Sequence, residues 1–121
     1  GGGYDTTHAA LAVQWMAELG CPQISALRAE IIGGITSEVQ PVVPDSVGAV
    51  TDLALEQSSV LCYLGATERV PKSWPAVVAA AQRDDGGWVD GENTWHTTLL
   101  ALWTLLAMES PGNGVSMVRT G

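Results

Sequence analysis

Two predicted helices of this chain end in the same way, with a pair of glycines followed by a large apolar residue. The two stops are Gly33-Gly34-Ile35 and Gly86-Gly87-Trp88, and in each the first glycine lies 11 residues after a proline, Pro22 or Pro75. Glycine at a helix C-terminus adopts the left-handed conformation that lets the chain reverse. We therefore expect a chain of helical hairpins closed by such turns.

Apolar residues recur at helical spacing in segments rich in Ala and Leu, and strand signals are weak. Glycines and prolines mark the predicted helix ends. The predicted helices cover residues 8–19, 22–32, 47–64, 76–83, 94 to the break at Pro111-Gly112, and 115–119, with a loop at 36–46. The sequence therefore predicts an all-α fold.

A second repeat links alternate helices. His8 with Trp15 matches His96 with Trp103, and Asp52 falls midway between the two histidines. Each hairpin leaves apolar surface uncovered, so neighbouring hairpins must stack. We expect a single domain over residues 1–121 with roughly 2.5 to 3 stacked hairpins. The repeats are predicted near residues 5–35, 46–88 and 94–121.

The charge and composition exclude several classes of protein. The net charge is −8 with only 5 Lys and Arg residues, which argues against binding nucleic acid or an anionic membrane surface. No apolar run approaches the roughly 20 residues of a membrane span, and a signal-peptide pattern is missing. Cys21 and Cys62 are too few for a disulfide framework or a zinc ribbon. We expect reduced cysteines and a cytoplasmic location.

The segment Gln82-Arg83-Asp84-Asp85-Gly86-Gly87-Trp88 resembles the Gln-x-x-x-Gly-x-Trp repeat of squalene and terpene cyclases. The longer stretch 86–106, with Trp95-His96-Thr97-Thr98-Leu99, is similar to the repeats of prenyltransferase β subunits. Tyr4-Asp5-Thr6-Thr7-His8-Ala9-Ala10-Leu11 resembles the start of another inner helix of that family. The resemblance implies stacked hairpins arranged as a partial α/α toroid, which a second copy or a partner subunit would complete. The same fold also serves noncatalytic modules, so it does not fix the function.

The chain departs from the family in two ways. It has no Asp-x-Asp-Asp string of the kind that class II cyclases use to protonate an alkene. Asp84 and Asp85 belong instead to the repeat turn. The prenyltransferase zinc set also needs a cysteine near the Asp90–Glu92 segment, and none is present. We therefore predict no metal and no other cofactor.

His8 and His96 occupy equivalent positions at the first turns of predicted inner helices, where the cavity of a toroid in this family opens. A histidine there could act as a general acid or base, or bind a metal. Its recurrence favours the other interpretation, a polar residue that bonds the preceding turn in each repeat. Both interpretations stay open.

The densest polar cluster is Asp90, Glu92 and His96. Glu92 and His96 would share a face if the helix begins early, but a zinc site needs a third ligand. Asp5 and Asp52 join this cluster only if the inner helices converge. The catalytic candidates are His96, Glu92, Asp90, His8 and Asp5.

Aromatic side chains are candidates for contact with an apolar substrate, because ring faces stabilise carbocations. At repeat positions, however, packing is the commoner role for a tryptophan. The run Glu56-Gln57-Ser58-Ser59 is interpreted either as a solvated stripe or as polar groups lining a cavity. The candidates for substrate binding are Trp95, Trp103, Trp15, Asp52 and Cys62.

The leading hypothesis is a small or truncated terpene-cyclase or prenyltransferase-like protein that binds an apolar, isoprenoid-like molecule between inner helices. If it is an enzyme, it cyclises or otherwise transforms that molecule. The alternative is a noncatalytic helical-repeat module that binds a partner protein or sequesters a hydrophobic small molecule. The missing acid motif and zinc set favour the alternative.

Overall fold

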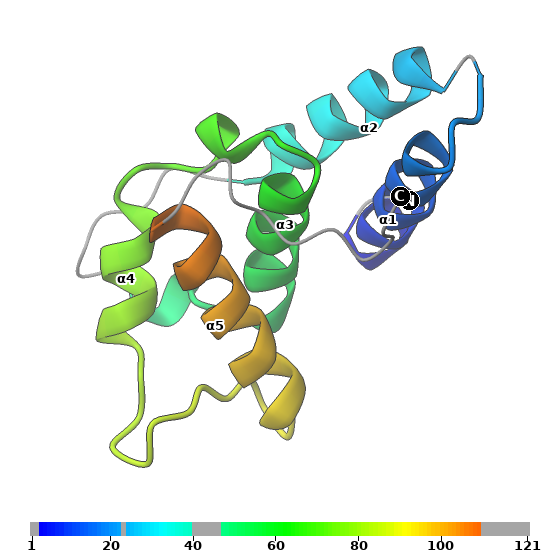
Figure 1. Ribbon diagram of the computed structural model, residues 1–121. Coiled ribbons are helices and arrows are strands. Elements are labelled where there is room, and N and C mark those ends of the chain that lie inside the picture. Colours follow the sequence, from blue (N-terminus) through cyan, green and yellow to red (C-terminus); the bar gives the residue numbers. More distant parts are fainter. Residues whose placement is uncertain (1–2, 23, 40–46, 110–121) are drawn as a thin grey trace.

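The computed structural model describes residues 3–22, 24–39 and 47–109, and this part of the chain is all-α, as predicted (Figure 1). The helices are α1 (Tyr4–Glu18), α2 (Ser25–Glu38), α3 (Asp52–Tyr63), α4 (Trp74–Ala80) and α5 (Trp95–Glu109), with short 3-10 turns η1 (Val47–Ala49) and η2 (Thr67–Arg69). The predicted helix at 115–119 lies outside the described residues.

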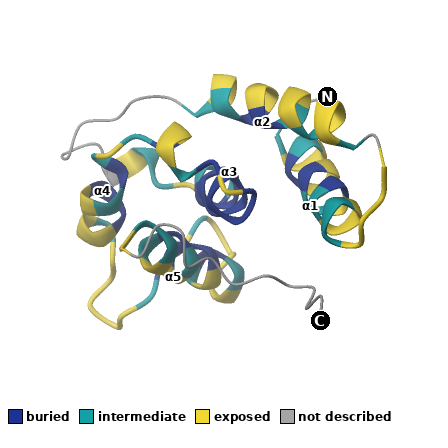
Figure 2. Cartoon of the chain, turned by 45° about the horizontal axis from the view of Figure 1, so that its top comes forward, coloured by how far each residue is buried: buried dark blue, intermediate teal, exposed yellow. Residues whose placement is uncertain are grey.

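Helix α3 is the centre of the fold. Its first turn is capped by Thr51, whose side-chain oxygen accepts a hydrogen bond from the backbone N–H of Ala54 at 3.1 Å. Leu55, Val60 and Leu61 are fully buried, and nearly all of the helix is enclosed. Figure 2 shows α3 as a dark blue coil with the other helices arranged around it. This burial explains why α3 can hold polar side chains away from water.

Helices α1, α3 and α5 lie side by side and run in the same direction. At their beginnings, the hydroxyl of Tyr4 donates to Asp52 at 2.8 Å, and His96 lies 2.9 Å from Asp52. Towards their ends, the hydroxyl of Tyr63 donates to Glu18 at 3.2 Å, and the ring of Tyr63 lies 5.9 Å from that of Trp103. Alternate helices of the chain are therefore parallel neighbours, with their first turns at one end.

The predicted helix stop at Gly33-Gly34 is wrong. Helix α2 continues through both glycines to Glu38, and neither has the positive φ of a left-handed cap. Ile32 and Ile35 are both buried, so the apolar face of α2 extends across the glycines. Packing of those two side chains outweighs a helix cost of about 1 kcal/mol per glycine. The predicted loop at 36–46 therefore begins too early.

The turn at 82–88 is closed as predicted. Gly86 has a φ of 90°, and its carbonyl accepts a hydrogen bond from the Gln82 side-chain amide at 2.8 Å. Asp85 accepts a hydrogen bond from the backbone N–H of Gly87 at 3.0 Å, which confirms its role in the turn. Trp88 is 2% exposed, and its indole N–H donates to the carbonyl of Val78 at 2.8 Å. The tryptophan thus ties the turn to the body of α4.

Several of the apolar residues whose spacing predicted α1 and α5 are exposed to solvent. In α1 the buried residues are Thr7, Ala10 and Val13, whereas Trp15 and Leu19 are exposed. Among the described elements, α1 makes extensive contact only with α2 and α3. It is therefore covered on one side. In α5 the exposed apolar residues form a single stripe, Trp95, Leu99, Leu102 and Leu106.

Candidate functional site

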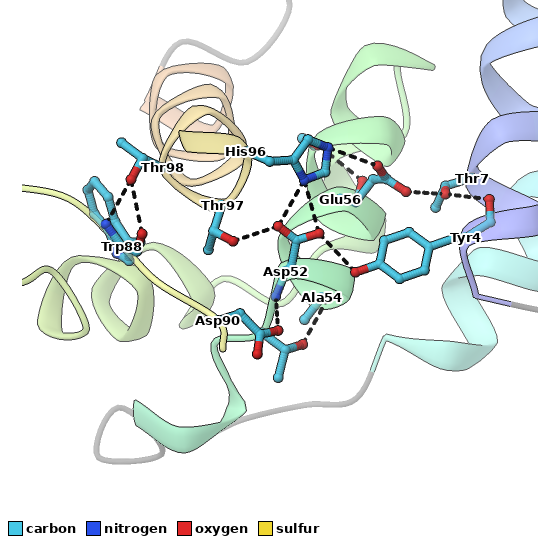
Figure 3. A network of polar contacts seen from close by, with 12 residues as sticks. Tyr4, Thr7, Asp52, Ala54, Glu56, Trp88, Asp90, His96, Thr97 and Thr98 are labelled. Atoms are coloured by element: carbon cyan, nitrogen blue, oxygen red, sulfur yellow. Dashed lines mark hydrogen bonds and ion pairs between the residues drawn. The ribbon is translucent and has the colours of Figure 1, made fainter. Parts of the chain in front are cut away.

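A polar cluster lies where α1, α3 and α5 begin, and each helix contributes to it from its first or second turn (Figure 3). First-turn positions of parallel helices meet because the helices start at the same end. The members are Tyr4, Thr7 and His8 from α1, Asp52 and Glu56 from α3, and His96 and Thr97 from α5.

Asp52 is the centre of the cluster and is 2% exposed. Its carboxylate accepts hydrogen bonds from the hydroxyl of Thr97 at 2.6 Å and from that of Tyr4 at 2.8 Å, and it lies 2.9 Å from Nδ1 of His96. Burial alone would raise the pKa of Asp52. The bonds from Thr97, His96 and Tyr4 and the charge of His96 outweigh burial and hold that pKa below its usual value.

The ring of His96 lies between two carboxylates. Nδ1 faces Asp52, and Nε2 lies 3.7 Å from a carboxylate oxygen of Glu56. Because Asp52 is ionised, Nδ1 must carry the proton, and this assigns the tautomer of the neutral ring. Nε2 is farther from Glu56 than a hydrogen bond allows. The side chain of His96 is 35% exposed, so the ring is within reach of a molecule outside the protein.

Glu56 joins α1 to the same cluster. It is buried, and its carboxylate accepts a short hydrogen bond from the hydroxyl of Thr7. Nε2 of His8 lies 3.9 Å from the same carboxylate, but the His8 side chain is mostly exposed. The run Glu56-Gln57-Ser58-Ser59 is buried rather than solvated. Its two serines form hydrogen bonds within the core, as in the 3.0 Å bond from the indole of Trp74 to Ser58.

Tyr4 forms the outer edge of the cluster. Burial, its hydrogen bond to Asp52 and the negative charges of Asp52, Glu56 and Asp90 together raise the pKa of Tyr4 well above its ordinary value. Ionising the phenol would place a second negative charge against Asp52. Tyr4 therefore acts as a hydrogen-bond donor in this arrangement.

Of the predicted catalytic residues, the structure brings His8 and His96 near each other, on either side of Glu56, and leaves the three acidic candidates apart from them. Asp90 accepts a hydrogen bond at 2.8 Å from the backbone N–H of Asp52, so it anchors the start of α3 rather than facing His96. Helix α5 begins at Trp95, so Glu92 lies in the preceding turn and does not share a helical face with His96. Asp5 is exposed in the first turn of α1, and no described contact links it to the cluster.

The predicted substrate-binding residues are dispersed. Trp95 is 76% exposed, and its ring meets that of His96 edge-on at 5.6 Å. Trp103 packs against Tyr63, and Trp15 is partly exposed on α1. Cys62 is buried in the core, and burial raises the pKa of its thiol, which disfavours a thiolate nucleophile. Only Asp52 and Trp95 of this set lie beside His96.

Within the described ranges, no group of three or more His, Cys, Asp or Glu side chains is arranged to hold a metal ion. The His8, Glu56 and His96 side chains are near one another, but the nitrogen-to-oxygen separations of 3.7 and 3.9 Å describe ion pairs.

Sequence reasoning missed Tyr4, Thr7 and Thr97, and it noted Glu56 only as part of a polar run without linking it to Asp52 or His96. Glu56 follows Asp52 by one helical turn, which was the available signal that both carboxylates share a face. Thr7 and Thr97 each adjoin a histidine that was already a candidate. For Tyr4 no sequence signal distinguished it from an ordinary aromatic residue.

Comparisons of the chain with protein-family models, curated proteins and solved structures gave no match. No helix among the described residues is long and apolar enough to cross a membrane.

Proposed function

We propose that this chain is a partial α/α toroid of the squalene-cyclase and prenyltransferase-like group that binds an apolar, isoprenoid-like molecule and transfers a proton through His96. The observation that carries the proposal is the position of His96, with Nδ1 at 2.9 Å from the buried Asp52 and a ring that is 35% exposed. A buried carboxylate fixes the tautomer and orientation of the ring, and Nε2 is left to act as the base.

The toroid assignment is supported by the parallel order of α1, α3 and α5. In the group that the sequence resembles, alternate helices form an inner wall and their starts lie at the mouth of the cavity. The Gln82–Trp88 turn, with its internal hydrogen bonds and buried tryptophan, also supports it.

The apolar nature of the ligand is supported by the stripe Trp95, Leu99, Leu102 and Leu106. These residues are spaced by four, three and four positions, so they share one face of α5, and all are exposed. The stripe begins at Trp95, whose ring touches that of His96. A ligand lying on this face would present its end to the imidazole.

An imidazolium is too weak an acid to protonate an isolated alkene. The reaction that fits His96 is removal and return of a proton at a carbon beside a carbonyl group. Geranylacetone, an isoprenoid ketone, is a suitable probe, and exchange of its α-protons in deuterium oxide can be followed by NMR. We expect wild-type protein to accelerate the exchange and His96→Gln to slow it by about 100-fold or more.

Binding of the probe is measured in parallel by tryptophan fluorescence. His96→Gln should bind geranylacetone with an affinity within about twofold of wild type, since the apolar stripe is intact. Lys72→Arg, on the loop before α4, serves as the control for adventitious amine catalysis and should exchange at the wild-type rate. Exchange that is unaffected by His96→Gln would refute the catalytic role.

The second candidate is the noncatalytic helical-repeat module, and one observation favours it. The Asp52 carboxylate accepts hydrogen bonds from Tyr4 of α1 and Thr97 of α5 and lies 2.9 Å from His96 of α5, so it joins α3 to both helices. Such a cluster can serve solely to join three helices. Binding of geranylacetone without any protein-dependent exchange would select this candidate.

A further inference from the structure

A second site lies apart from the His96 cluster, in a pocket of about 290 Å³ between the end of α2, η1, α3 and the start of α4. None of the residues of the polar cluster lines it. From α3 it takes Leu53, Ala54 and Gln57, which lie on a different side of the helix from Asp52 and Glu56. Its volume is at the lower end of the range for small-molecule sites.

The walls of this pocket are largely apolar. Val39, Leu53 and Ala54 are aliphatic residues of the wall, and the buried Trp74 is part of it as well. The indole N–H of Trp74 is already engaged, because it donates to Ser58 at 3.0 Å. Trp74 therefore offers the pocket an aromatic surface rather than a hydrogen-bond donor.

The charge in the pocket comes from Glu38. Its carboxylate accepts hydrogen bonds from the side-chain amide of Gln57 and, at 3.1 and 3.2 Å, from the backbone N–H of Gly3. Gln57 is 5% exposed, so the bond that orients the carboxylate is held by a fixed, buried side chain. Among the ion pairs of the described residues, none involves Glu38.

We infer that this pocket binds a small organic cation, an ammonium group carried on an apolar body. The ammonium would pair with the negative charge of Glu38, which lacks a cationic partner within the described part of the chain. The apolar body would bury its surface against Leu53, Ala54 and the ring of Trp74, and an aromatic wall is itself attractive to a cation. The net charge of −8 favours encounter with cations. The inference does not depend on the role proposed for His96.

The charge requirement is tested by calorimetric titration with 2-phenylethylammonium and its neutral counterpart 2-phenylethanol. We expect saturable binding of the ammonium and at least about tenfold weaker binding of the alcohol. Glu38→Gln should weaken ammonium binding about tenfold, because it removes the charge and keeps a similar shape. Glu30→Gln, an exposed position on the same helix, is the matched control and should bind as wild type.

The location is tested by Ala54→Leu, which fills the pocket with a larger side chain and should abolish binding. Circular dichroism checks that this variant is folded, and the NMR signal of the Gln57 side-chain amide in wild type should shift on titration with the ammonium. No saturable binding, equal binding of the alcohol, or unchanged binding by Glu38→Gln would overturn the inference. Binding that survives in folded Ala54→Leu and leaves the Gln57 signal unshifted would do the same.

Discussion

One carboxylate oxygen of Asp52 lies 2.9 Å from Nδ1 of His96, although the two residues are 44 positions apart in the chain. The contact joins the first turn of α3 to the first turn of α5. Tyr4 adds α1 to the same carboxylate from 48 positions away. One buried charge therefore holds three parallel helices in register at one end, and it also orients the imidazole of His96.

Asp52→Asn should lower the free energy of unfolding by about 3 kcal/mol, because a buried charge cluster loses one partner. An amide has a single acceptor oxygen, whereas the carboxylate receives Tyr4, Thr97 and His96. Urea denaturation followed by circular dichroism measures the change. Asp84→Asn, at an exposed position in the turn after α4, is the control and should stay within about 0.5 kcal/mol of wild type. A similar loss in both variants would contradict the prediction.

Stability should fall in acid as Asp52 takes up a proton. The pKa of Asp52 is lower in the folded protein than the ordinary value of 3.8, so the unfolded chain binds more protons between the two values. The contribution of Asp52 is complete above its ordinary pKa and is lost as the pH falls through the folded-state pKa. Urea titrations from pH 6 downwards should show a shallower decline for Asp52→Asn than for wild type. Parallel curves would show that Asp52 is not the responsible group.

Tyr4 should make the protein sensitive to alkali. Its pKa is raised in the folded state, so its contribution to stability is complete below the ordinary pKa of 10.0 and is lost as the pH rises above that value. Tyr4→Phe should destabilise the protein by about 1 kcal/mol near neutral pH. The difference between the two proteins should shrink above pH 10.0. The absorbance titration at 295 nm should lose a phenol that titrates above pH 10.0 in the variant; an unchanged titration would count against the assignment.

The two glycine pairs should respond in opposite ways to alanine. Gly33 lies inside α2 and a Cβ there meets no atom within 4 Å, so Gly33→Ala should stabilise the protein by about 0.5–1 kcal/mol. Gly86 has a φ of 90° and also has open space, so Gly86→Ala should cost about 1–2 kcal/mol through backbone strain alone. Thermal unfolding of the two variants distinguishes the signs. Destabilisation by both would mean that Gly33 also has a non-helical role.

The segments that were predicted well are those whose structure depends on neighbours in the sequence. Helical spacing of Ala and Leu residues located α1, α3, α4 and α5, although the helix predicted from residue 47 begins only at Asp52, after the short turn η1. The turn at 82–88 was also predictable, because its hydrogen bonds join residues that are close in the chain. At Gly33 the same local reasoning failed, since buried Ile35 continues the apolar face of α2 beyond the glycines.

The sequence by itself determined the helical class and the turn around Gly86, whereas the predicted equivalence of His8 and His96 did not hold, since His8 lies in the second turn of α1 and His96 in the first turn of α5. Spacing and turn chemistry suffice for the helical class and the turn, because they act over a few residues. Only the tertiary structure decided that Asp52 and Glu56 are both buried against His96, and that Asp5 and Glu92 lie apart from them. The physical reason is that the cluster forms between helices that are far apart in the sequence. Their direction and rotation are set by which faces pack on α3, and local periodicity does not encode that choice.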